Sequence, residues 1–442
     1  MIHYVASIGE KSLPMKDAEK SLAYIVAMIL LAAVSCCRAA EAVPEMPIVA
    51  WGWPFSVAEA DIAHYRLVRD CGCNVTIQYV KGVADAKKCL DAAQKAGVRL
   101  LLHNDGVLDQ PEKAVPQIKG HPALCAYYLT DEPPVSKMHA LGAKARRIRA
   151  LDPAHPVYMN WFGLVDDKMR WYGVPTFDEY LDTSIREVPT GLFTFDVYPI
   201  YSPRFGKRPF ARASGPLHLR SDWYASLEAV SLRSRRTKTP FWAFAAIVPI
   251  RNHPQWDNPM PTVAHLRLQQ YSNLAYGAQG LQYYDFRPSA SSVKNYATDE
   301  APLSPDGKIT PSYWRLAEVN RELQARAWVF LGSEPVCIRH TGTAPEGTTA
   351  YDAGKDRPSL VTSFAPDGEL LVSELANGSW AALVVVNRNP NAVSAFAAKF
   401  RSGVERVCRD GRTVPACGGT YPMDAGDAEI FVWNRKAKGD GR

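Results

Sequence analysis

The sequence predicts an α/β protein, a (β/α)8 TIM barrel followed by a small antiparallel β-sandwich domain. Eight short apolar and β-branched runs each end in polar residues, and segments with helical periodicity separate them. After about residue 328 the helical periodicity stops, and short alternating runs broken by turns replace it. With 442 residues and 47% hydrophobic content, the chain is long enough to build both cores.

The N-terminal residues have the character of an export signal. Two lysines precede an apolar run over residues 22–34 that is too short to span a bilayer comfortably. Small residues near its end predict a signal peptide over residues 1–42, and hence a secreted or periplasmic protein. The alternative is a loose lipobox, with a lipoprotein signal to residue 35 and membrane anchoring through a lipidated Cys36 at the outer membrane or cell surface.

The barrel is expected over residues 43–327. Near-continuous apolar strands fit a parallel sheet that is covered by helices. The helical periodicity between the strands is clearest over residues 135–152 and 260–278. The eight predicted strands are residues 47–54, 73–79, 98–105, 123–133, 156–161, 191–199, 240–248 and 280–286.

The sandwich is expected over residues 328–435, after a helix at 312–327. The remaining residues, 436–442, are charged and are expected to be a disordered tail. Cys408 and Cys417 flank a turn-like segment, so they either close a hairpin disulfide in an oxidising compartment or stay free.

The charge distribution and the missing motifs exclude several functions. The 51 basic and 45 acidic residues are scattered along the chain, so the basic stripe of a nucleic-acid-binding protein is missing. The sequence contains no Gly-rich phosphate loop, no HExxH and no GxSxG. We therefore expect no nucleic-acid partner, no cofactor and no metal.

Polar side chains at the strand ends are expected to converge on one mouth of the barrel. Strand four ends in two adjacent carboxylates, Asp131 and Glu132, which two prolines follow. A carboxyl that is partly enclosed by aromatic walls beside another carboxylate has a raised pKa, so it can donate a proton near neutral pH. Other acids at strand ends are Asp196, Asp285 and Asp105.

Aromatic and polar side chains at the same ends are suited to bind a carbohydrate. Flat aromatic faces stack on the C–H faces of sugar rings, while polar groups reach the hydroxyls. His103 and Asn160 have an alternative interpretation as hydrogen-bonded strand-end residues without a ligand. The candidate substrate-binding residues are Trp51, Trp53, Tyr79, His103, Asp105, Asn160, Trp161, Tyr198, Tyr284 and Asp285.

The eight βα units, the Asp131-Glu132-Pro133 motif closing strand four, the aromatic strand ends and the terminal β-domain form one pattern. In this pattern the chain resembles glycoside hydrolases of the clan A-like (β/α)8-barrel superfamily over most of residues 47–435. The resemblance implies that Glu132 is the proton donor and that Asp131 stands where the clan usually has Asn. It also implies a nucleophilic Glu at the end of strand seven, where this chain has no acid.

The second catalytic carboxylate is therefore open. Asp196 is the first candidate for base or nucleophile, before Asp285 and Asp105, although Asp196 could instead hydrogen-bond backbone groups in a tight loop. Glu132 could likewise be a loop residue that caps the following helix rather than the proton donor.

Three functions follow from these alternatives. The first is a secreted glycosidase that cleaves O-glycosidic bonds of oligo- or polysaccharides with Glu132 as general acid. The second is a catalytically silent barrel that binds carbohydrate. The third is a substrate-assisted, hexosaminidase-type enzyme, in which Asp131 steers the acetamido group of the substrate and Glu132 is the acid.

Overall fold

The computed structural model describes residues 45–52, 54–104, 109–164, 168–203, 216–250, 256–289, 292–293 and 300–434. The expected export signal with Cys36, and the expected tail over 436–442, lie outside these residues. Among the described helices, none combines the length and the hydropathy needed to traverse a membrane.

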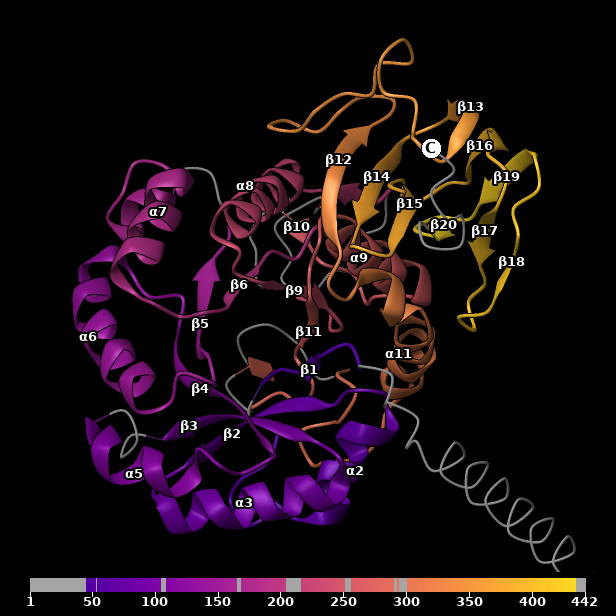
Figure 1. Cartoon of the computed structure of the whole chain (residues 1–442). Coiled ribbons are helices and arrows are strands. Elements are labelled where there is room, and N and C mark those ends of the chain that lie inside the picture. The colour runs from indigo at the N-terminus through magenta and orange to yellow at the C-terminus, as the bar shows by residue number, and fades with distance from the viewer. Residues whose placement is uncertain are drawn as a thin grey trace, which may run out of the picture. The chain divides into compact units, whose positions relative to one another are not determined.

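A closed barrel of eight parallel strands confirms the first part of the predicted fold (Figure 1). Around the barrel the order is β1-β11-β9-β6-β5-β4-β3-β2, and the pairing of β1 with β11 closes it. Each of the eight predicted strand segments overlaps one of these strands. The strands are β1 (Ile48–Ala50), β2 (Val75–Val80), β3 (Arg99–Asn104), β4 (Leu124–Asp131), β5 (Val157–Phe162), β6 (Phe193–Asp196), β9 (Phe241–Ala246) and β11 (Gly280–Tyr284).

Helices follow the strands and cover the outside of the barrel (Figure 1). Side chains that accept a backbone N–H fix the start of several: Asp61 caps α2, Thr176 caps α7 and Thr262 caps α9. The helices are α2 (Ile62–Asp70), α3 (Val83–Ala96), α5 (Pro111–Ile118), α6 (Val135–Leu151), α7 (Phe177–Glu187), α8 (Ser221–Thr237), α9 (Val263–Ala275) and α11 (Pro311–Phe330), with the 3-10 helix η1 (Lys168–Tyr172) before α7. A small antiparallel sheet of β7 (Ile200–Pro203), β8 (His218–Leu219) and β10 (Trp256–Asp257) lies in the loops after β6 and β9.

Strand side chains alternate between two cores, because successive residues of a strand point to opposite faces. On β5, Tyr158 belongs to the cluster inside the barrel, whereas Met159 and Trp161 belong to the cluster between barrel and helices. On β9, Trp242 and Phe244 face inward and their neighbours outward. This alternation decides which strand-end residues reach the mouth.

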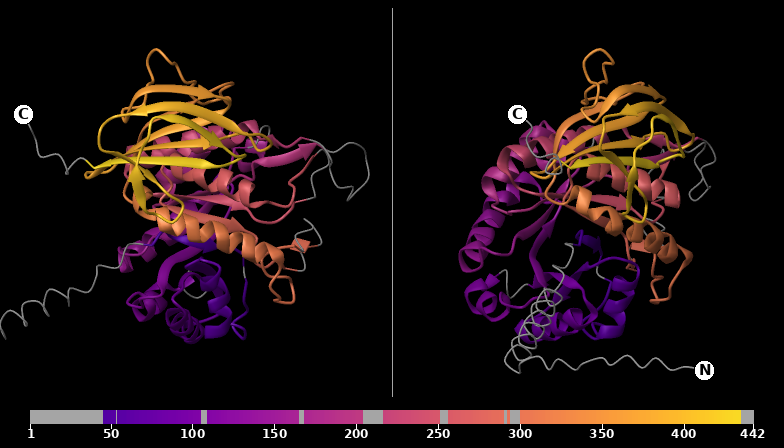
Figure 2. Two further views of the ribbon diagram at one scale, coloured as in Figure 1. Left: turned by 90° about the vertical axis from the view of Figure 1, so that its right-hand side faces the viewer. Right: turned by 45° about the vertical axis from the view of Figure 1, so that its right-hand side comes forward.

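Antiparallel sheets confirm the second part of the predicted fold class, and Figure 2 shows their strands grouped together. Six strands form one sheet in the order β12-β14-β15-β20-β17-β18, and three form another in the order β13-β16-β19. A separate apolar cluster includes Val372, Leu383 and Phe431 of the larger sheet and Phe396 of the smaller one. The strands are β12 (Glu334–His340), β13 (Val361–Asp367), β14 (Leu370–Ala376), β15 (Trp380–Asn387), β16 (Ser394–Phe400), β17 (Val404–Val407), β18 (Thr413–Pro415), β19 (Gly419–Met423) and β20 (Ala428–Asn434).

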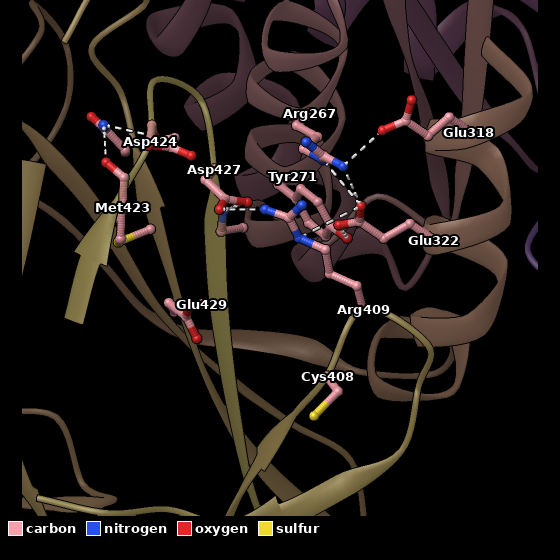
Figure 3. Close-up of polar contacts among 12 residues, drawn as sticks. Arg267, Tyr271, Glu318, Glu322, Cys408, Arg409, Met423, Asp424, Asp427 and Glu429 are labelled. Atoms are coloured by element: carbon pink, nitrogen blue, oxygen red, sulfur yellow. Dashed lines mark hydrogen bonds and ion pairs between the residues drawn. The ribbon is translucent and has the colours of Figure 1, made fainter. Parts of the chain in front are cut away.

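An ion-pair network around Glu322 of α11 joins helices of the barrel to the sheets, and Figure 3 shows Arg409 between Glu322 and Asp427. Glu322 accepts hydrogen bonds from Arg267 (3.0 Å) and Tyr271 (2.7 Å) of α9 and from Arg326 (3.1 Å) of α11. Arg326 also donates to the carbonyl oxygens of Val407 and Cys408 in the sandwich. The charges therefore tie α9 and α11 to the β17–β18 turn.

The cysteines of the sandwich are free thiols in the structure. Cys408 is half-buried and Cys417 is exposed, and neither forms a disulfide. The hairpin disulfide that the sequence left open is thus not formed.

Candidate active site

Three carboxyl groups meet at the C-terminal ends of β4 and β6. Asp131 is the last residue of β4, Glu132 follows it, and Asp196 is the last residue of β6. β5 lies between these two strands in the barrel, so its side chains separate the acids. We call Asp131, Glu132 and Asp196 the acid cluster.

Asn160 of β5 bridges two members of the acid cluster. Its Nδ2 donates to Asp131 Oδ1 at 3.1 Å and to Asp196 Oδ1 at 3.0 Å. The hydroxyl of Thr194 donates to Asn160 Oδ1 at 3.0 Å, which fixes the amide with its NH2 toward the two acids. Because Asn160 is only 2% exposed, the amide is a rigid, neutral spacer between two carboxylates.

Glu132 has a strained backbone. Its φ is +40°, in the left-handed region that residues other than glycine rarely adopt, and its N–H donates to the Asn160 carbonyl at 3.0 Å. The next residue, Pro133, is buried, and its carbonyl accepts a hydrogen bond from Tyr180 at 3.0 Å. Such strain persists only where the surroundings over-determine it, and it concentrates at functional sites.

Burial and mutual repulsion shift the pKa values of the acids. Asp131 is open to solvent at the mouth, but protein atoms crowd its other sides, and this burial together with repulsion from Asp196 raises its pKa to about 7. Burial also raises the pKa of Asp196, while hydrogen bonds with Asn160, Glu132 and Tyr198 and the positive charge of Arg220 act in the opposite direction. With a pKa of about 7, the Asp131 carboxyl is partly protonated near neutral pH.

Aromatic rings surround the acid cluster. Tyr198 stacks on Tyr284 with ring centroids 5.4 Å apart, and Tyr284 contacts Trp51 at 5.6 Å. Burial and the nearby carboxylates raise the pKa of Tyr198 and of Tyr172 in η1. The acids therefore lie in a setting of low polarity, which strengthens their mutual repulsion.

Tyr79 and His103 lie at the ends of β2 and β3, beside the acid cluster. Their rings are 5.5 Å apart, and His103 is 5.3 Å from Tyr128. His103 Nδ1 is 3.0 Å from the Tyr128 carbonyl oxygen. The pKa of Tyr128 is raised by burial first and then by Asp131, which connects this aromatic row to the acids.

Two predicted site residues are placed differently. Trp161 is 1% exposed and packs on Phe193 in the cluster between barrel and helices, because it follows the inward-facing Asn160 and must point outward. Asp285 is 3% exposed, and a Cβ on Gly52 would lie 2.4 Å from its Oδ1, so its carboxyl is buried beneath the β1 loop. Burial raises the pKa of Asp285 to about 7.

The remaining predicted residues near the mouth of the barrel are Trp51, Trp53 and Asp105. Trp51 is 9% exposed and belongs to the core inside the barrel. Trp53 and Asp105 lie outside the described residues. The end of β9, residues 241–250, carries no carboxylate, as the sequence indicates.

Several residues of the site are not among those predicted from the sequence. Thr194 could have been predicted, because it lies two positions before Asp196 and therefore on the same face of the strand. Tyr172, Tyr180 and Arg220 come from η1, α7 and the start of α8. Nothing in the sequence near them indicates the acid cluster.

The described residues contain no group of three or more His, Cys, Asp or Glu side chains arranged to hold a metal ion.

Comparisons with known proteins support the fold. No protein-family model matches the chain, and the search for similar curated sequences found no match. The chain is similar to solved structures of Gan42B, a GH42 β-galactosidase from G. stearothermophilus. A catalytic mutant of that enzyme matches with a TM-score of 0.57 at 10% identity, over 88% of this chain and 98% of the other. The structure of Gan42B itself matches with a TM-score of 0.56 at the same identity and coverage.

At this identity the similarity concerns the fold, a TIM barrel of the kind found in glycoside hydrolases with antiparallel sheets after it. Barrels of one architecture host many chemistries. The fold alone therefore does not determine the function, which depends on the acid cluster and its surroundings.

Proposed function

We propose that this protein is a glycoside hydrolase in which Glu132 protonates the leaving glycosidic oxygen. The acid cluster carries the proposal, because Glu132 lies beside Asp131, whose pKa is raised to about 7, and Asp196, whose pKa is also raised, at the end of the barrel where enzymes of this fold bind substrate. The left-handed backbone of Glu132 ends the regular strand geometry at this residue. The glycosidase-like fold is consistent with a carbohydrate substrate.

The separation of the carboxyl groups indicates which group attacks the sugar. Two-carboxylate glycosidases keep their acids ~5–5.5 Å apart when retaining and ~6.5–9.5 Å apart when inverting. Glu132 hydrogen-bonds Asp196 directly, which is closer than either class allows. Asp285 is buried, and the end of β9 has no acid. This geometry favours Asp196 as a partner that holds the proton of Glu132, rather than as nucleophile or base across the sugar ring.

Substrate assistance is the mechanism that these positions support best. Asp131 directly precedes the acid and is open at the mouth, where it can accept a hydrogen bond from the N–H of a 2-acetamido group. The acetamido oxygen then attacks the anomeric carbon while Glu132 protonates the departing oxygen. Water opens the resulting bicyclic intermediate, and Glu132 takes back the proton. The proposed substrates are therefore glycans with N-acetylated sugars.

Hydrolysis assays test the proposal. The native chain should release sugar from N-acetylated glycans, and Glu132→Gln should lower kcat on unactivated substrates by about 10²–10⁴-fold. Glu179→Gln is the control, since Glu179 belongs to the exposed first turn of α7. Full activity of Glu132→Gln would remove Glu132 from the mechanism.

Paired substrates test the attacking group. The native chain should cleave an aryl 2-acetamido glycoside and leave the matching 2-hydroxy glycoside intact. Efficient cleavage of the 2-hydroxy compound would instead support Asp196 as the second carboxylate. Binding of glycans without any cleavage would support the silent carbohydrate-binding barrel, which the acid-free end of β9 favours.

A further inference from the structure

A hollow opens on the same face of the barrel as the acid cluster. It has a volume of about 910 Å³, and its lining residues follow the C-terminal ends of β1, β2 and β11. We call it the β1–β2 groove, and it is lined by Pro54, Phe55, Tyr79, Lys81, Arg287 and Pro288, among others. Its size lies in the range of roughly 300–1,000 Å³ that is typical of small-molecule sites.

The lining of the β1–β2 groove combines apolar walls with a charged rim. Phe55 and Pro54 are buried in its wall, while Tyr79 exposes 37% of its surface. Glu59 and Arg287 pair with each other at 2.9 Å, and Lys81 and Asp85 add one charge of each sign. The charges balance, so the groove favours a neutral ligand with both C–H faces and hydroxyl groups over an anion.

An aromatic row connects the β1–β2 groove to the acid cluster. Tyr79 lines the groove, its ring lies 5.5 Å from His103, and His103 lies 5.3 Å from Tyr128. The charges of all three acids act on Tyr128. Tyr128 is 3% exposed and supports His103 from inside the barrel, so a chain of linked sugars whose scissile bond lies at the acids would pass over His103 to reach Tyr79.

We propose that the β1–β2 groove is a subsite for a distal, neutral sugar residue of an oligosaccharide, with Tyr79 as its stacking platform. The inference rests on the proposed function, since it places the reacting sugar at the acid cluster. It adds that the substrate is an oligosaccharide or polysaccharide rather than a single glycoside.

Binding measured against chain length tests the subsite. The probes are N-acetylglucosamine and its β-1,4-linked di-, tri- and tetrasaccharides, titrated by calorimetry into the full chain carrying Glu132→Gln. Affinity should rise with length, and adding Tyr79→Ala should lower the tetrasaccharide affinity about tenfold while leaving that of the monosaccharide unchanged. Tyr351→Ala, in the sandwich part of the chain, is the control and should change neither.

The outcomes separate this inference from the proposed function. Length-dependent binding that Tyr79→Ala abolishes, with no hydrolysis by the native chain, supports the subsite and contradicts the enzyme. Hydrolysis with equal kcat/KM for every length, untouched by Tyr79→Ala, overturns the subsite alone. If none of the probes binds and none is cleaved, both are contradicted.

Discussion

At the residue scale, the acid cluster depends on one neutral side chain. Asn160 donates to both Asp131 and Asp196 and keeps the two carboxylates from direct contact. Its hydrogen bonds lower the pKa of each acid, against the larger effect of burial. Asn160 is thus a positioning residue that sets how many protons the cluster carries.

Asn160→Ala should therefore move the pH profile. Without its hydrogen bonds the pKa of Asp131 rises, so the acidic limb of kcat, where Asp131 must ionise, shifts to higher pH. Activity at neutral pH should fall about tenfold or more, because hydrogen bonds to charged groups contribute about 1.5–3 kcal/mol. Thr194→Ser keeps the hydroxyl that orients Asn160 and should leave the profile unchanged. An unshifted limb in Asn160→Ala would contradict the positioning role.

Asp285 makes stability depend on pH. Its pKa is about 7 in the folded chain and near 3.8 when unfolded, so the folded state holds an extra proton between these values. Raising the pH from about 4 to 7 should reduce the free energy of unfolding, on the order of 4 kcal/mol for this buried group. Chemical denaturation across this range should show the fall, and Asp285→Asn should reduce its slope and leave the part that Asp131, whose pKa is also raised to about 7, contributes. An equal slope in the variant would show that other groups cause it.

At the element scale, the sequence predicted each barrel strand but not which side chains reach the mouth. Runs of apolar residues locate strands because burial on both faces demands them. The faces follow from the alternation within each strand. Asn160 and Trp161 are adjacent and cannot both point inward, and the structure packs Trp161 in the cluster between barrel and helices while Asn160 faces the acids.

The conformations and contacts of the loop residues could not be predicted from the sequence. The turn after β4 places Glu132 in a left-handed conformation, and hydrogen bonds from distant elements hold it there. Tyr172, Tyr180 and Arg220 reach the acids through tertiary packing, which periodicity does not encode. For the same reason, the hydrogen bond between Glu132 and Asp196 could not be predicted from the sequence.

The packing of α6 on α7 is close at Gly142. A Cβ at this position would lie 2.1 Å from the Glu187 carbonyl oxygen, a backbone atom that cannot move alone. Gly142→Ala should therefore destabilise the chain by about 1–3 kcal/mol, in spite of the better helix propensity of alanine. Gly120→Ala, with no atom near the added Cβ, is the matched control in thermal unfolding. Equal melting temperatures would contradict the close contact.

At the scale of the whole molecule, Glu322 joins the barrel helices to the sandwich. The side chains of Glu322 and Arg326 are 6% and 4% exposed, so neither charge has water as a substitute partner. The same Arg326 satisfies two carbonyls beyond the barrel.

Glu322→Ala should destabilise the molecule by about 3–5 kcal/mol, since it leaves the buried Arg326 without a carboxylate. Glu318→Ala is the matched control on the same helix. Its pair with Arg267 is at the surface, with Glu318 55% exposed, and should contribute no more than about 1 kcal/mol. Denaturant unfolding measures both, and similar losses would argue against a special role for the buried network.

The central claim is that Glu132 donates a proton to the leaving oxygen, and leaving-group dependence tests it most directly. Aryl 2-acetamido glycosides with good and poor leaving groups should be compared in the native chain and in Glu132→Gln. A dinitrophenyl leaving group needs no proton, so the variant should cleave that substrate nearly as fast as the native chain, while a poor leaving group loses about 10²–10⁴-fold. An equal loss on both substrates, or no loss on either, would contradict the assignment of Glu132 as the acid.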